Sequence, residues 1–138
     1  MRAAGSILLL LGLAALVGGM LFFGTVMAPL VFLHLPAFVA GPFIRLTFPW
    51  YYNYTIWSAG VVAVGMLLRR DWLWLVVPLA VIGVTCGLWF VLLPVLDGYR
   101  AAHDAAGFTF LHQLSVWLNG AELLAAAMLL IRLAARIN

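Results

Sequence analysis

Long apolar stretches separated by charged residues dominate the chain. Divided at its charges, the sequence gives four such stretches, at about 7–35, 49–68, 72–93 and 108–130. A helix needs about 20 apolar residues to cross the hydrocarbon core of a bilayer, where every backbone polar group must be satisfied internally. The pattern therefore predicts an all-α protein: an integral membrane four-helix bundle of up-down topology, forming one transmembrane domain over residues 1–138.

Glycine and proline positions add detail to these helices. The first stretch exceeds the minimal length and contains Gly24 and Pro29, so we expect a tilted or kinked helix there. In the third stretch, Gly83 and Gly87 form a GxxxG pattern. That pattern favours a close helix contact, either within the bundle or between two copies of the chain.

Composition excludes several classes of protein. Of the 138 residues, 67% are hydrophobic and 8% charged, against about 25% charged in soluble domains, which excludes a water-soluble enzyme domain. The seven basic residues are arginines scattered between apolar runs, so no nucleic-acid-binding surface is predicted. The single cysteine, Cys86, has no partner for an internal disulfide. No phosphate-binding loop or catalytic triad is recognisable, and we assign no catalytic residues.

The arginines also predict the orientation in the membrane. Four spans place both termini on one side. Five arginines fall on that side and two, Arg45 and Arg100, on the other; the five are Arg2, Arg69, Arg70, Arg132 and Arg136. Because positive charge is retained in the cytoplasm, we expect a multi-pass protein of the bacterial inner membrane with cytoplasmic N- and C-termini.

Polar side chains inside the fourth span form a seam. At 100° per residue, His112, Ser115, Asn119 and Glu122 lie within an arc of about 80° on one helix face. One interpretation is a path for a ligand, a proton or a metal, from His112 at the outer end to Glu122 near mid-membrane. The other is a set of hydrogen bonds to neighbouring helices, with Glu122 either functional or protonated.

The three histidines all map to the outer half of the bundle: His34 at the end of the first span, His103 in the last loop and His112 early in the fourth span. Imidazole binds copper and serves as an axial ligand of haem iron. We therefore consider His112 a candidate ligand of haem b or copper, with His34 or His103 as its partner. The alternative is that these interfacial histidines are simply solvated.

Four charged residues share the outer face with the histidines. Arg45, Asp97, Arg100 and Asp104 lie near the ends of the predicted spans. Charges of both signs in a small area favour a network that ties the outer loops together. Binding of an anion is the alternative interpretation.

Several short segments together resemble a known family. They are Phe22-Phe23-Gly24 with Pro29-Leu30 and Phe32, then Phe48-Pro49-Trp50-Tyr51-Tyr52, then Leu93-Pro94, and finally Phe110-Leu111-His112 with Ser115 and Asn119. Their order and spacing resemble the transmembrane protein 205 family, a membrane domain of unknown function found in bacteria and eukaryotes.

The resemblance implies a small four-helix membrane protein. It carries over to this chain Pro29, Tyr51, Tyr52, His112, Ser115 and Asn119, and it does not carry over His34, His103 or Glu122. The family is in turn distantly similar to copper resistance D-like proteins and to haem-binding membrane protoporphyrinogen oxidases, which favours a haem or metal site at the fold level only.

Three functional hypotheses follow. The first is a haem- or copper-binding four-helix protein with His112 as ligand. The second is an accessory or assembly subunit of a larger membrane complex, because almost none of the 138 residues lie outside the bilayer. The third is a transporter of a proton or small solute, which needs self-association because four helices rarely enclose a pore alone. An enzyme is the less expected outcome.

Overall fold

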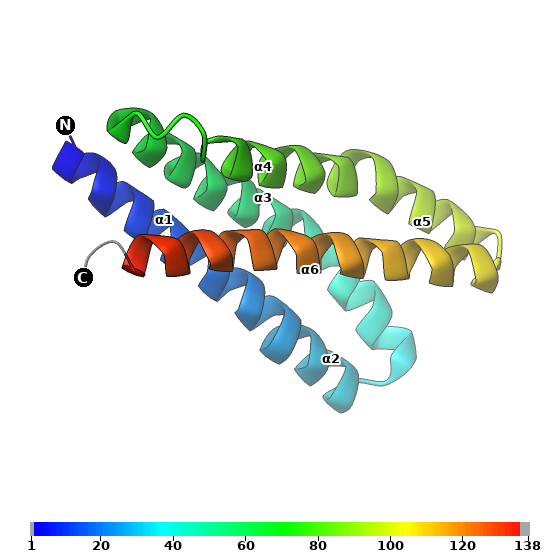
Figure 1. Cartoon of the computed structure of the whole chain (residues 1–138). Coiled ribbons are helices and arrows are strands. Elements are labelled where there is room, and N and C mark those ends of the chain that lie inside the picture. The colour runs from blue at the N-terminus through cyan, green and yellow to red at the C-terminus, as the bar shows by residue number, and fades with distance from the viewer. Residues whose placement is uncertain (1, 136–138) are drawn as a thin grey trace.

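The computed structural model describes residues 2–135, and within them every extended element is helical. The elements are α1 (Arg2–Phe22), η1 (Phe23–Met27), α2 (Ala28–His34), α3 (Ala37–Arg69), α4 (Val76–Gly87), η2 (Leu88–Leu92), α5 (Leu93–Ala101) and α6 (Ala105–Ala135). The π-helical segments η1 and η2 join their neighbours without a break, so the described residues form four continuous rods (Figure 1). The predicted all-α fold is confirmed at this level.

Three of the rods are long and apolar enough to cross a membrane: Arg2–His34, Val76–Ala101 and Ala105–Ala135. The remaining rod, α3, is 33 residues long. Its tyrosines, prolines and Arg45 lower its mean hydropathy, but it packs along α1 and α4 within the same bundle. The chain is therefore a multi-pass membrane protein by length and composition.

Two helices extend beyond the apolar stretches predicted as spans, and both extensions have the same physical reason. The second helix begins at Ala37 rather than near 49, and the third begins at Val76 and continues to Ala101 rather than ending near 93. Dividing the sequence at charges separated Arg45 and Asp97 from their helices, but these two side chains form an ion pair between α3 and α5. Paired charges do not have to end a helix.

Each π-helical segment is followed, two residues after its end, by a proline. The N–H of Ala28 donates to the carbonyl of Phe23, and the N–H of Leu93 to that of Leu88, five residues earlier in each case. Pro29 and Pro94 follow directly. Proline has no N–H and its ring clashes with the carbonyl four residues before it, so a wider turn accommodates it. The irregularity predicted at Pro29 is thus a π-helical turn.

Glycines bring α1 and α3 close together. Gly5, Gly12 and Gly19 recur every seven residues along α1, and each faces α3. A Cβ added to Gly12 would lie 2.9 Å from the backbone nitrogen of Val62, and one added to Gly65 would lie 2.7 Å from that of Leu9. Small residues allow helix backbones to approach closely in a membrane. The core beside this contact consists of Leu9, Leu13, Val62, Met66, Leu129 and Leu133.

The GxxxG pattern of α4 makes no comparable contact. A Cβ added to Gly83 or Gly87 meets no atom within 4 Å in the part of the chain that the structure describes. The contact within the bundle that this pattern favoured is therefore not formed. Contact between two copies of the chain stays a prediction.

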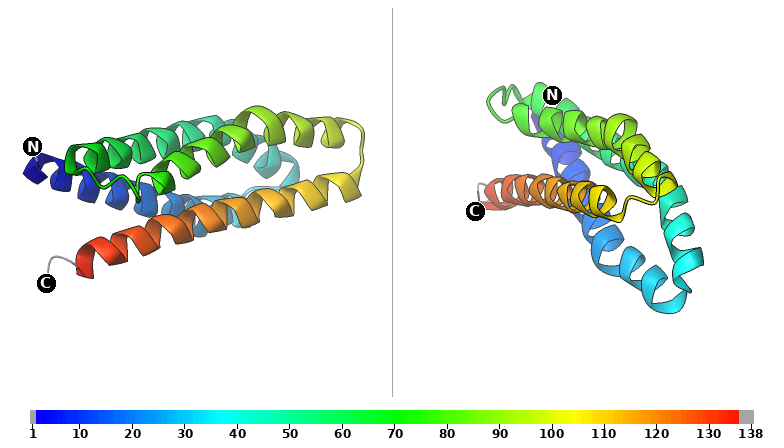
Figure 2. Two further views of the ribbon diagram at one scale, coloured as in Figure 1. Left: turned by 45° about the horizontal axis from the view of Figure 1, so that its top comes forward. Right: turned by 90° about the vertical axis from the view of Figure 1, so that its right-hand side faces the viewer.

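The rods alternate in direction, and the two termini lie at the same end (Figure 1). The turn between α3 and α4 lies at that end, while the turns from α2 to α3 and from α5 to α6 lie at the other. At that other end α2 and the first part of α3 diverge from α6, as Figure 1 and the right-hand view of Figure 2 show. Arg136 of the predicted orientation pattern lies outside the described residues.

Candidate functional site

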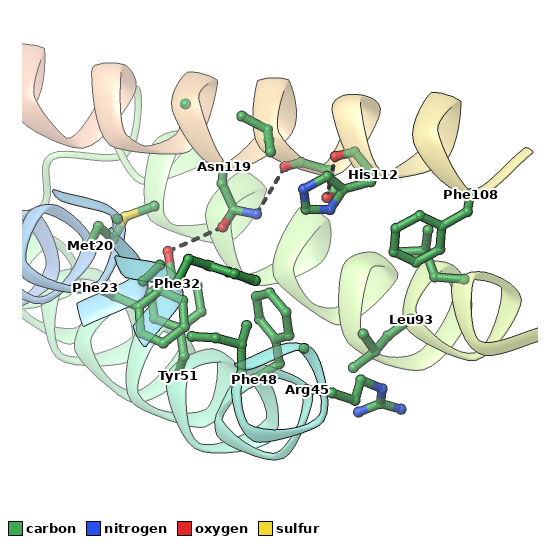
Figure 3. Close-up of a pocket in the computed structure, with 18 of the residues that line it drawn as sticks. Met20, Phe23, Phe32, Arg45, Phe48, Tyr51, Leu93, Phe108, His112 and Asn119 are labelled. Atoms are coloured by element: carbon green, nitrogen blue, oxygen red, sulfur yellow. Dashed lines mark hydrogen bonds between the residues drawn. The ribbon is translucent and has the colours of Figure 1, made fainter. Parts of the chain in front are cut away.

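A large cleft lies in the region where α2 and α6 diverge. Its volume is about 690 Å³, within the range of small-molecule sites. Most of its walls are apolar or aromatic (Figure 3): Met20, Phe23, Ala28, Phe32, Ile44, Phe48, Leu93, Leu96, Phe108, Val116 and Leu123. Polar side chains occur at a few positions only: Thr25, Arg45, Tyr51, Asp97, Arg100, His112, Ser115 and Asn119. α1, α2, α3, α5 and α6 all contribute.

One polar group of the cleft joins α3 to α6. The hydroxyl of Tyr51 donates a hydrogen bond to Oδ1 of Asn119 at 3.1 Å, and Nδ2 of Asn119 donates to the carbonyl of Ser115 at 2.9 Å. The Ser115 hydroxyl donates to the carbonyl of His112 at 2.7 Å. Tyr51 is held from the other side by the ring of Phe23, whose centroid lies 4.2 Å away. The side chain of Asn119 is thus fixed in orientation.

The predicted seam therefore divides into two parts. His112, Ser115 and Asn119 line the cleft from α6, as their common helix face predicted. Glu122 does not line it: this carboxyl group is 4% exposed and accepts a hydrogen bond from the hydroxyl of Thr85 of α4 at 2.7 Å. Glu122 lies one helical turn beyond Asn119, beneath the surface of the cleft.

The three histidines are not brought together. His112 lines the cleft, and its ring stacks on Phe108 with centroids 5.8 Å apart. His34 is exposed at the end of α2, where its Nδ1 lies 3.0 Å from the carbonyl of Leu30. His103 is exposed in the turn before α6, with φ of 56°. Within residues 2–135, no three His, Cys, Asp or Glu side chains gather as a metal site would need, so the predicted set of three ligands is not assembled.

The outer charges are arranged at one end of the cleft. Nε of Arg45 donates to Asp97 at 2.8 Å and 3.0 Å to its two oxygens, and Nη2 also contacts Oδ2. Arg100 interacts electrostatically with Asp97, and its guanidinium lies 5.0 Å from the centroid of the Phe108 ring. Asp104 instead accepts from the backbone N–H of Gly107 at 3.0 Å. The predicted network thus comprises three residues, while Asp104 caps α6.

Sequence reasoning missed two partners of the seam. Thr85 is the one hydroxyl in the apolar stretch at 72–93, a polar residue whose position inside a predicted span was the available signal. Tyr51 was named as a residue that the family resemblance carries over. Its hydrogen bond to Asn119, 68 positions along the chain, depends on the packing of α3 against α6, which no local pattern reveals.

A family model described as a domain of unknown function, DUF4149, matches residues 11–105. The match covers most of α1 and extends through α5, while α6 with His112 and Asn119 lies beyond it. No curated protein and no solved structure matches the chain.

Proposed function

We propose that this chain, which belongs to the DUF4149 family, binds a small molecule with an apolar body and an anionic end inside the membrane. The observation that carries the proposal is the cleft of about 690 Å³, with apolar and aromatic walls and few polar groups. Such a combination is typical of ligand sites, in which apolar surfaces supply affinity and a few polar atoms fix orientation.

The charges at one end of the cleft favour an anionic group on the ligand. Two arginines and one aspartate line this end, leaving one excess positive charge. Asp97 holds Arg45 through both carboxylate oxygens, whereas Arg100 lies over Phe108 and forms no salt bridge within the described residues. Arg100 is therefore the residue that we expect to contact an anionic group.

Haem b is one ligand of this class, and the residues fit it in part. It has an apolar ring with carboxylate side chains, and His112 on the cleft wall would be the protein ligand of its iron. Arg100 would lie toward its carboxylates. A second histidine ligand is not supported, because neither His34 nor His103 lines the cleft. A bound haem would supply redox or gas-binding chemistry, and the chain would hold it and exclude water.

Copper is less well supported than haem. A copper site needs several nitrogen or sulfur ligands in a fixed geometry, and the described residues gather no three His, Cys, Asp or Glu side chains. The similarity to copper resistance D-like proteins and to the transmembrane protein 205 family stays an expectation from sequence segments. The accessory-subunit and transporter hypotheses likewise stay predictions.

The orientation of the chain in the membrane is also a proposal, and the positions of the arginines support it. Arg2, Arg69, Arg70 and Arg132 belong to helix ends that lie with the termini in Figure 1. We propose that this end is cytoplasmic in a bacterial inner membrane, because positive charge is retained on the cytoplasmic side. The mouth of the cleft with Arg45 and Arg100 would then lie in the outer half of the bilayer.

The test is to purify the protein from native membranes in a mild detergent and identify what is bound. We expect a stoichiometric amphipathic anion, identified by mass spectrometry of an organic extract. A Soret band in the absorption spectrum would identify it as haem, and a colourless sample with an extracted lipophilic anion would identify another member of the class. Protein that carries no such molecule, and takes up none when haem or an anionic lipid is added, would reject the proposal.

A further inference from the structure

Glu122 has an unusual environment among the four acidic residues of the chain. Its side chain is 4% exposed, Thr85 donates to Oε1 at 2.7 Å, and Oε2 is buried without a hydrogen-bond partner in the structure. The three aspartates differ. Each is paired near an end of the bundle, and the pairs are Asp97 with Arg45, Asp71 with Arg69, and Asp104 with the backbone N–H of Gly107.

The groups that surround Glu122 supply no compensating positive charge. From α3, Tyr51 and Tyr52 interact with it electrostatically, and from α4 Thr85 contacts it directly. On α6 the nearest polar residue of the seam is Asn119. The adjoining cluster, which includes Leu16 and Met20 of α1, is apolar. Arg132, on the same helix, lies over the ring of Trp74, ten residues or about 15 Å further along.

An ionised carboxylate in this position would be costly. Burial of a charge in a low-dielectric interior is tolerated when it is paired and fully hydrogen-bonded, and Glu122 has one hydroxyl donor. A neutral carboxyl group fits the same geometry at lower cost, because Oε1 accepts from Thr85 as a carbonyl oxygen would and no charge is buried. Oε2, which no donor reaches, is then the oxygen that carries the proton.

We propose that Glu122 and Thr85 form a proton-binding site beneath the cleft, which holds an exchangeable proton on Oε2 at neutral pH. The proton exchanges with the cleft by way of Asn119, one helical turn from Glu122 on α6, and Tyr51, which interacts electrostatically with Glu122; both side chains line the cleft and are hydrogen-bonded to each other. The site goes beyond the proposed ligand binding and does not depend on it, because Glu122 does not line the cleft.

Infrared spectroscopy tests this directly, because a neutral carboxyl group has a C=O band well separated from that of a carboxylate. The purified protein at neutral pH, in a detergent that contains no ester or carboxyl groups, is expected to show one such band, since each of the three aspartates has an arginine or a backbone N–H as its partner. The band should shift in heavy water and disappear in Glu122→Gln. Wild-type protein without this band at neutral pH would overturn the proposal.

Two further variants keep the test sharp if Glu122→Gln fails to fold. Thr85→Val preserves shape and removes the donor, so the band should remain and move to higher frequency as its hydrogen bond is lost. Thr109→Val is the matched control, because Thr109 bonds to the carbonyl of Ala105 on its own helix and should leave the band unchanged. A C=O band whose frequency does not change in Thr85→Val would contradict its assignment to Glu122.

The route to the cleft has its own measurement. The rate at which the band shifts after transfer to heavy water reports proton exchange at Oε2. Asn119→Leu and Tyr51→Phe are expected to slow this exchange at least severalfold, whereas Thr109→Val leaves it unchanged. Equal rates in all variants would overturn the route. The infrared measurement can be made on protein with an empty or an occupied cleft, so its failure is distinguishable from failure of the ligand proposal.

Discussion

Arg45 of α3 and Asp97 of α5 form a bidentate ion pair across 52 positions of the chain, with Nε of Arg45 2.8 Å from Oδ1 and 3.0 Å from Oδ2. The pair joins two rods at the charged end of the cleft, and the two side chains are 29% and 42% exposed. Its position explains how two helices continue through charged residues, and it fixes one cation at the site where we expect an anionic ligand group.

Asp97→Asn should lower the free energy of unfolding by about 1 kcal/mol, because the pair is half-exposed and solvent weakens its attraction. The measurement is unfolding of the protein in detergent by increasing denaturant. The exchanged variant Arg45→Asp/Asp97→Arg should recover part of the loss, since it restores opposite charges. Asp104→Asn is the comparison, because Asp104 caps α6 and forms no ion pair with an arginine in the described residues. An exchanged variant that is no more stable than Arg45→Asp alone would contradict the pairing.

Tyr51→Phe and Asn119→Leu should each destabilise the bundle, and their effects should not add. The Tyr51 hydroxyl donates to Asn119 at 3.1 Å, and hydrogen bonds between helices in membrane proteins contribute about 0.6 kcal/mol on average. A double-mutant cycle in the same unfolding assay measures this coupling. Additive losses would show that the two side chains do not stabilise each other.

The all-helical architecture could be predicted because it depends on local properties. Apolar stretches of about 20 residues satisfy their backbone hydrogen bonds internally in lipid, whatever lies beside them. The continuation of α3 and α5 through Arg45 and Asp97 could not be predicted in this way, because the partner of each charge lies on another helix. A charged residue therefore need not mark the end of a helix when another helix supplies its partner.

The candidate site was predictable on one helix and unpredictable across helices. Helical periodicity correctly placed His112, Ser115 and Asn119 on one face. It gave no information about which residues of other helices that face meets, so Tyr51 and Thr85 were missed as partners. The grouping of His34 and His103 with His112 assumed that residues at the same depth are neighbours, but the divergence of the rods places only His112 on the cleft.

Gly65→Ala should destabilise the protein by about 1–3 kcal/mol, the usual cost of overpacking a tight contact. The new Cβ would lie 2.7 Å from the backbone nitrogen of Leu9, and neither backbone can yield without separating α1 from α3. Gly60→Ala is the matched control on the same helix, because a Cβ there meets nothing within 4 Å. Thermal unfolding of both variants in detergent decides the matter. Equal midpoints would show that the close approach of α1 and α3 is not required.

Variants of the cleft should distinguish haem from other amphipathic anions. Haem would be held through His112, so His112→Ala should abolish its binding, while His103→Ala, outside the cleft, should leave it unchanged. Arg100→Gln removes a charge that either kind of ligand would use, and loss of one charge-assisted contact of about 1.4 kcal/mol raises Kd about tenfold. An anionic lipid should therefore depend on Arg100 more than on His112, and haem the reverse. The measurement is a titration of each purified variant with haem and with an anionic lipid. The ratio of the change in Kd caused by His112→Ala to that caused by Arg100→Gln shows which residue determines binding. Affinities unchanged by both substitutions would show that the ligand binds elsewhere.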